Sequence, residues 1–133
     1  MASGRIQDRI PTEHEEAVLF ADWLRLKHLI FAHIPNETYT TSWNQKRKNK
    51  QEGVSPGVPD YMILLTGELT RDGERKLLFV ELKRKKGIRG GKISRVSDDQ
   101  EFWILNLSTV SGVDAEICYG FDEAKSFVEA HLK

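Results

Sequence analysis

Hydrophobic and polar residues recur along the chain with two periods, one helical and one strand-like. Apolar side chains spaced three and four apart, such as Ala17, Phe20 and Leu24, predict helices. The helical segments are 13–28, 98–110 and 122–132. Short apolar runs bounded by turn residues predict strands at 29–34, 60–65, 76–83 and 115–120. The pattern therefore predicts the order αβββαβα.

Capping and turn residues mark the ends of these elements. Thr12 is a predicted helix N-cap, and Glu15 three residues later completes a capping box. Ser97 is a second predicted N-cap, and Gly112 follows the end of that helix. The dipeptide Asp72-Gly73 is a strong turn signal, so the strands on either side of it should form an antiparallel hairpin.

These elements predict an α/β fold with a mixed central sheet flanked by helices. The last strand follows a helical crossover and should lie parallel to a neighbour. A length of 133 residues with 39% hydrophobic residues suits one domain, 1–133, with residues 1–10 as a flexible tail. No apolar run is long enough to span a bilayer. The lone Cys118 excludes an internal disulfide and a multi-cysteine zinc site, and the composition suits a cytoplasmic protein.

The segment 37–57 is polar, basic and punctuated by glycine and proline. It predicts a long loop with a short helix at 46–51, and a loop of this length in a compact domain is usually functional. The chain is neutral overall, but residues 43–97 hold 14 of the 20 Lys and Arg and 6 of the 20 Asp and Glu, so this stretch carries +8 and the remainder −8. Such asymmetry indicates either a polyanion-binding face or a solvated, lysine-rich surface.

Two of the predicted strands carry acids where apolar residues would be expected. Asp60 opens the apolar run "YMILL", and Glu81 follows "LLFV" directly. Antiparallel pairing places the start of one strand beside the end of the next, so both carboxylates should share one sheet edge. Lys83 has the same side-chain parity as Glu81 and should project from the same face.

Two neighbouring carboxylates without His or Cys suit Mg²⁺ or Mn²⁺, which prefer hard oxygen ligands. Taken singly, Asp60 could be only a turn residue, and Glu81 with Lys83 only a solvated ion pair. Together they are more specific, because an unpaired carboxylate after four apolar residues would be costly to bury.

The stretches "EGVSPGVPDYMILL" and "LLFVELKRKKG", in this order and spacing, resemble the signature of the PD-(D/E)xK nucleases. More narrowly, the chain resembles the VRR-NUC family, the virus-type replication-repair nuclease domain. Further matching stretches extend the resemblance over almost the whole chain: "TEHEEAVLFADWLRL", "HIPN", "SDDQEFWILNL" and "AEICYGFDEA". The resemblance implies a restriction-endonuclease-like core.

The resemblance also implies roles for individual residues. Asp60, Glu81 and the backbone carbonyl of Leu82 would be metal ligands, and Lys83 the catalytic lysine. Gln100 matches a family glutamine that faces the site, although by itself it could be a surface residue. The family has a glutamate on the first helix that would join the metal ligands. Glu13 fits this position best and Glu16 competes with it, while either could simply favour the helix dipole.

Basic residues on both sides of this candidate site are candidate phosphate contacts, which would position DNA without reading its sequence. Trp43 could stack on a base or simply pack within the loop. The basic candidates are Lys46, Arg47, Lys48, Lys50, Arg84, Lys85, Arg89, Lys92 and Arg95.

The resemblance implies a metal-dependent endonuclease from a phage or bacterium, acting on branched DNA as a Holliday junction resolvase. A resolvase cuts two symmetric strands, so a domain with one site predicts a homodimer. Three alternatives remain open at this point: a nuclease for flaps, nicks or duplex DNA, a DNA-binding module without catalysis, and a protein–protein adaptor that uses the basic loops.

Overall fold

A mixed four-stranded sheet forms the centre of the protein in the computed structural model, which describes residues 9–35, 41–85 and 95–133. The strands follow the order β1-β2-β3-β4. They are β1 (Ile30–His33), β2 (Tyr61–Leu65), β3 (Lys76–Lys83) and β4 (Val113–Tyr119). β1, β2 and β3 pair antiparallel, and β4 joins β3 in parallel. The predicted mixed sheet and hairpin are therefore confirmed.

The helices are α2 (Glu13–Leu26), α3 (Trp43–Gln51), α4 (Asp98–Leu107) and α5 (Phe121–Glu129). Both predicted N-caps are confirmed, because Thr12 and Ser97 each close a capping box. The predicted short helix at 46–51 begins three residues earlier, since the Ser42 side chain accepts a hydrogen bond from the Gln45 N–H and caps it. Within the described residues, the order of elements is therefore αβαββαβα.

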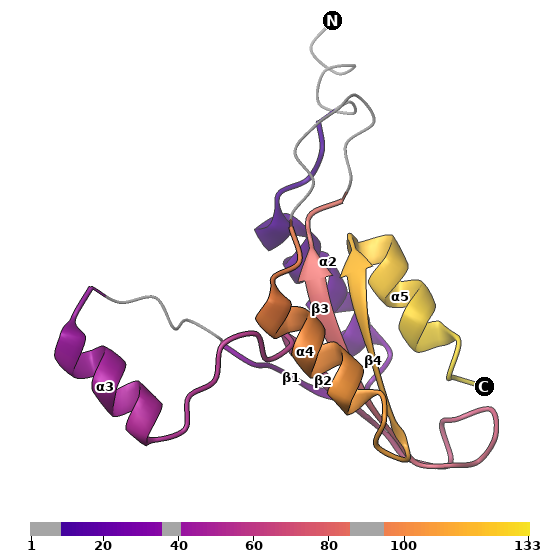
Figure 1. The fold of residues 1–133 in the computed structure, drawn as a ribbon. Coiled ribbons are helices and arrows are strands. Elements are labelled where there is room, and N and C mark those ends of the chain that lie inside the picture. Colours follow the sequence, from indigo (N-terminus) through magenta and orange to yellow (C-terminus); the bar gives the residue numbers. More distant parts are fainter. Residues whose placement is uncertain (1–8, 36–40, 86–94) are drawn as a thin grey trace, which may run out of the picture.

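Helices cover both faces of the sheet (Figure 1). α2 and α5 pack on one face, where Phe20, Leu24 and Val128 are fully buried against alternate residues of β2 and β3. α4 contacts β4 on the other face. Because side chains alternate along a strand, Leu78, Val80 and Leu82 face the α2–α5 core. The alternate residues of β3, which include Glu81 and Lys83, consequently face the α4 side.

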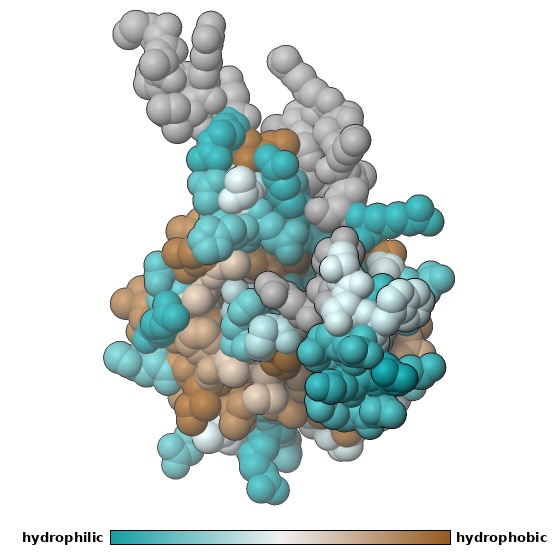
Figure 2. Space-filling model, turned by 90° about the vertical axis from the view of Figure 1, so that its left-hand side faces the viewer, coloured by the Kyte–Doolittle hydropathy of each residue, from teal (hydrophilic) through white to brown (hydrophobic). Residues whose placement is uncertain are grey.

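α3 differs from the other helices in its surroundings. It stands away from the sheet in Figure 1 and buries none of its residues. In Figure 2 it lies nearest the viewer as a strongly hydrophilic surface beside a more hydrophobic body. Across the described ranges, no helix is both long and apolar enough to cross a membrane.

Gly57 fixes the approach of the chain to β2. It has a φ of +87°, and a Cβ at this position would lie 2.5 Å from the backbone carbon of Asp99 at the start of α4. Pro59, two residues later, is fully buried. This close backbone contact therefore sets the position of Asp60 relative to the first turn of α4.

We expect Gly57→Ala to lower the free energy of unfolding by about 2–5 kcal/mol, because a left-handed backbone strain and a clash with Asp99 add together. Gly73→Ala is the matched control. Its φ is +73° but nothing lies within 4 Å of an added Cβ, so it should cost only about 1–2 kcal/mol. Urea denaturation measures both, and equal losses would contradict the close contact at Gly57.

Candidate active site at the ends of β2 and β3

The strand register brings the two predicted acids together. Tyr61 pairs with Val80, so the next residues outward, Asp60 and Glu81, lie opposite each other. Their side chains interact, since Asp60 raises the pKa of Glu81. Two carboxylate charges in such close proximity repel, which favours a proton on one of them.

Asp60 is held at both its backbone and its side chain. Its carbonyl accepts a hydrogen bond from the Ile34 N–H at 2.6 Å, just after β1. Its Oδ2 accepts from the Leu82 N–H at 2.9 Å. The side chain therefore caps the end of the β2–β3 ladder.

Glu81 is the member of the pair that holds the proton. Its side chain is buried, with only 3% of the residue exposed. Burial raises the pKa of Glu81 to about 9, the hydrogen bond to Asp60 and the Asp60 charge add to the shift, and Lys83 opposes it. At neutral pH, Glu81 is consequently neutral.

Lys83 and Glu13 complete the charged cluster. Lys83 is 9% exposed at the end of β3, and its positive charge lowers the pKa of both Glu81 and Glu13. Glu13 begins α2. Although Glu13 is exposed, partial desolvation and the charge of Asp60 raise its pKa overall. These couplings place Glu13, Asp60, Glu81 and Lys83 in one electrostatic neighbourhood.

Glu16, the competing first-helix glutamate, lies elsewhere. The residue is 4% exposed, and its carboxylate accepts a hydrogen bond from the Phe121 N–H at the start of α5. The structure thus separates the two glutamates, with Glu13 beside Asp60 and Glu16 against α5.

Gln100 has no hydrogen bond to the charged cluster among the described residues, whereas the Leu82 backbone contacts Asp60. Gln100 is the third residue of α4 and completes its capping box, because its Oε1 accepts a hydrogen bond from the Ser97 N–H at 3.0 Å. Among the described residues, no hydrogen bond joins it to Asp60, Glu81 or Lys83. The Leu82 N–H points to Asp60, and because the N–H and C=O of one strand residue point to the same neighbour, its carbonyl lies on that side too.

The predicted DNA contacts are dispersed. Trp43 is 80% exposed on α3, and the Lys46 ammonium lies 5.1 Å from its ring. The other basic residues of α3, together with Lys85 and Arg95, are exposed, whereas Arg89 and Lys92 lie outside the described residues. Arg84 is exposed, but its guanidinium donates to the carbonyls of Pro11 and Ile10.

The donor set fits a hard divalent cation better than zinc. Asp60 and Glu81 offer carboxylate oxygens, and the Leu82 carbonyl lies beside them. Within the ranges that the structure describes, no group of three or more His, Cys, Asp or Glu residues is assembled to hold a metal. A pair of carboxylates is enough for Mg²⁺, which usually keeps several waters, whereas structural zinc requires four ligands.

The fold and this cluster define an α/β domain with the PD-(D/E)xK arrangement, an acid and an acid–lysine pair at the ends of two antiparallel strands. The profile of the VRR-NUC domain matches residues 1–122. The chain therefore belongs to the VRR-NUC domain family, and its function is of the nuclease type.

A solved structure described as a VRR_NUC domain protein has the same fold. It is 20% identical to this chain and superposes with a TM-score of 0.62, covering 92% of this chain and 89% of its own. No curated protein sequence matches the chain significantly.

Sequence reasoning missed the contacts of Glu16 and Arg84. Glu16 lies one helical turn before Phe20 and two turns before Trp23, a spacing that signals that it faces inward with them. Arg84 continues a basic run and has no such signal, so its partners Ile10 and Pro11 emerge only from the fold.

In protein free of divalent cations, we expect the free energy of unfolding to fall as pH rises. Folded Glu81 keeps its proton up to about pH 9, but its ordinary pKa is 4.5. Between these values the folded state binds more protons, so this contribution is complete below about pH 4.5 and is lost as pH rises through about 9.

Urea denaturation in EDTA between pH 6 and 8.5 measures this dependence. The Glu81→Gln side chain cannot ionise. The difference in the free energy of unfolding between this variant and the unsubstituted protein should therefore change by up to about 1.4 kcal/mol per pH unit. Parallel pH profiles for the two proteins would show that Glu81 does not hold the proton.

Proposed function

We propose that this protein is a metal-dependent, structure-specific DNA endonuclease that hydrolyses backbone phosphodiesters, acting as a homodimer on four-way junctions. The observation that supports this most is the convergence of Asp60, Glu81 and Lys83 at one sheet edge in a VRR-NUC domain. The cofactor would be Mg²⁺ or Mn²⁺, held by Asp60, Glu81, the Leu82 carbonyl and Glu13.

Each residue of the cluster has a distinct part in the proposed reaction. When bound, the cation would lower the pKa of a water and neutralise charge on the phosphate. Glu81 would release its proton to solvent, and its carboxylate would then hold the cation together with Asp60. The Lys83 ammonium holds the scissile phosphate or orients the attacking water, and the Gln100 amide can donate to the same phosphate.

Exposed basic residues outside the cluster would hold the DNA backbone. α3 combines four cations with an exposed Trp43 on a helix that stands off the body, which suits phosphate contact combined with base stacking. The proposed phosphate contacts are Lys46, Arg47, Lys48, Lys50, Lys85, Arg89, Lys92 and Arg95.

α4 supports the proposed homodimer. It contains apolar residues around its whole circumference, yet none of its residues is buried. Phe102 and Leu105 are 61% and 60% exposed. A helix that is apolar on its outer side normally packs against another element, so we propose this side of α4 as the contact with a second copy.

Cleavage mapping on an end-labelled four-way junction with Mn²⁺ tests the activity. We expect paired, symmetric nicks, and Asp60→Ala, Glu81→Ala and Lys83→Ala should each slow cleavage at least about a hundredfold while the fold and most DNA binding remain. Near-normal cleavage by Glu81→Ala would refute the metal-site mechanism.

The same assay separates the alternatives. Faster cutting of a flap than of the junction, without paired nicks, would identify a flap nuclease. Binding without cleavage of any branched or linear DNA would identify a binding module. Failure to bind DNA even at low salt would favour a protein–protein adaptor.

The double variant Phe102→Asp/Leu105→Asp should convert the dimer to a monomer, because a desolvated carboxylate cannot be accommodated in an apolar contact. Sedimentation equilibrium measures the mass, and the junction assay should show single nicks in place of paired ones. Leu26→Asp is the control, since Leu26 is 73% exposed on α2. A monomeric unsubstituted protein, or a variant that stays dimeric, would contradict the α4 contact.

A further inference from the structure

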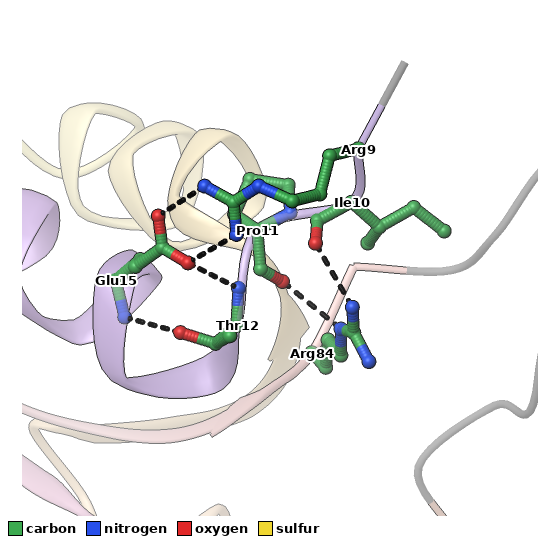
Figure 3. Close-up of polar contacts among 6 residues, drawn as sticks. All are labelled: Arg9, Ile10, Pro11, Thr12, Glu15 and Arg84. Carbon is green, nitrogen blue, oxygen red and sulfur yellow. Dashed lines mark hydrogen bonds and ion pairs between the residues drawn. The ribbon is translucent and has the colours of Figure 1, made fainter. Parts of the chain in front are cut away.

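Arg84 connects the end of β3 to the residues that lead into α2. Its Nε donates to the Pro11 carbonyl at 3.0 Å, and its Nη2 donates to the Ile10 carbonyl at 2.9 Å (Figure 3). Arg84 directly follows Lys83, and Pro11 lies two residues before Glu13. The Arg84 guanidinium therefore links the backbone next to Lys83 to the backbone just before Glu13.

The stretch held by this guanidinium is itself rigid. The Glu15 N–H donates to the Thr12 hydroxyl at 3.1 Å, and the Thr12 N–H donates to Glu15 at 3.2 Å. Arg9 adds two hydrogen bonds to the same Glu15 carboxylate, at 2.7 and 2.8 Å (Figure 3). A displacement of Pro11 would consequently be transmitted to the first turn of α2 and to Glu13.

Glu16 forms a second connection on the other side of Glu13. Its carboxylate accepts from the Phe121 N–H, while the preceding Gly120 N–H donates to the Lys83 carbonyl at 2.9 Å. Gly120 has a φ of +89° and supplies no side-chain cap to α5, and a Cβ there would lie 2.7 Å from the Glu16 Oε2. Two successive N–H groups thus join α2 to the backbone of Lys83.

We infer that Arg84 and Glu16 are positioning residues, which fix α2 against β3 from both sides and thereby set the place of Glu13 relative to Lys83. The inference rests on the proposed function. This positioning role takes the place of the phosphate contact predicted for Arg84 from its charge, because the Arg84 guanidinium already donates to two carbonyls. A lysine cannot reproduce this planar, two-pronged contact although it keeps the charge.

Arg84→Lys separates positioning from phosphate binding. We expect its single-turnover cleavage rate at saturating junction to fall about ten- to a hundredfold, since small displacements of a reacting group have such effects. Its dissociation constant for the junction should stay within about twofold, because the positive charge is kept. A phosphate contact would give the opposite result, a nearly normal rate for Arg84→Lys and weaker binding with a shallower salt dependence for Arg84→Met.

Arg71→Lys is the matched control. The Arg71 Nε donates to the Leu132 carbonyl at 2.7 Å, so this substitution also breaks an arginine–carbonyl contact, but next to the C-terminus. It should leave the cleavage rate unchanged. For Glu16, the Gln variant keeps an acceptor for the Phe121 N–H and should retain most of the rate that Glu16→Ala loses.

Amide hydrogen exchange gives a second measurement that does not depend on cleavage. In Arg84→Lys the amides of Glu15 and Glu16, which donate to Thr12, should exchange faster while those of β2 and β3 keep their protection. Unchanged exchange and rate, or acceleration throughout the molecule, would overturn the inference. If the unsubstituted protein cuts no DNA, the proposed function fails, and the exchange pattern still decides whether Arg84 fixes α2.

Discussion

The proximity of two carboxyl groups, half-buried Asp60 and buried Glu81, is the interaction around which the rest of this structure is arranged. Both groups lie at the ends of largely apolar runs, and two negative charges so close together would repel strongly. The protein resolves the conflict by giving the pair different environments. Asp60 is half-buried and receives a backbone N–H, while Glu81 is deeper and keeps its proton. This asymmetry depends on the register of β2 and β3.

Elements encoded by local signals could be predicted from the sequence. The residues of β3 were predicted at its observed bounds, because "LLFV" is flanked by a turn and a basic glycine-rich stretch. The caps at Thr12 and Ser97 need only residues within one turn, so the sequence contains all of the information. The convergence of Asp60 and Glu81 followed from one further step, the antiparallel pairing that Asp72-Gly73 indicates.

Features that depend on distant segments could not be predicted in the same way. α5 begins at Phe121, one residue before the predicted start, and its first N–H is satisfied by Glu16 from α2. No sequence pattern near Gly120 predicts that Glu16, more than a hundred residues away in sequence, accepts this hydrogen bond. The contact of Arg84 with Pro11 is of the same kind, because a basic residue in a basic run most often indicates solvent or a polyanion.

The acids in the first turn of α2 illustrate how tertiary contacts divide residues that the sequence treats alike. Glu13, Glu15 and Glu16 all favour the helix dipole, so their clustering alone assigns none of them a role. The fold pairs Glu15 with Arg9 and Thr12, which lowers the pKa of Glu15, and it directs Glu16 to α5. Glu13 remains exposed, and partial desolvation together with the charge of Asp60 raises its pKa. The neighbours of Glu13 are thus engaged in holding the helix, whereas Glu13 is the acid of this turn that is coupled electrostatically to Asp60 and Lys83.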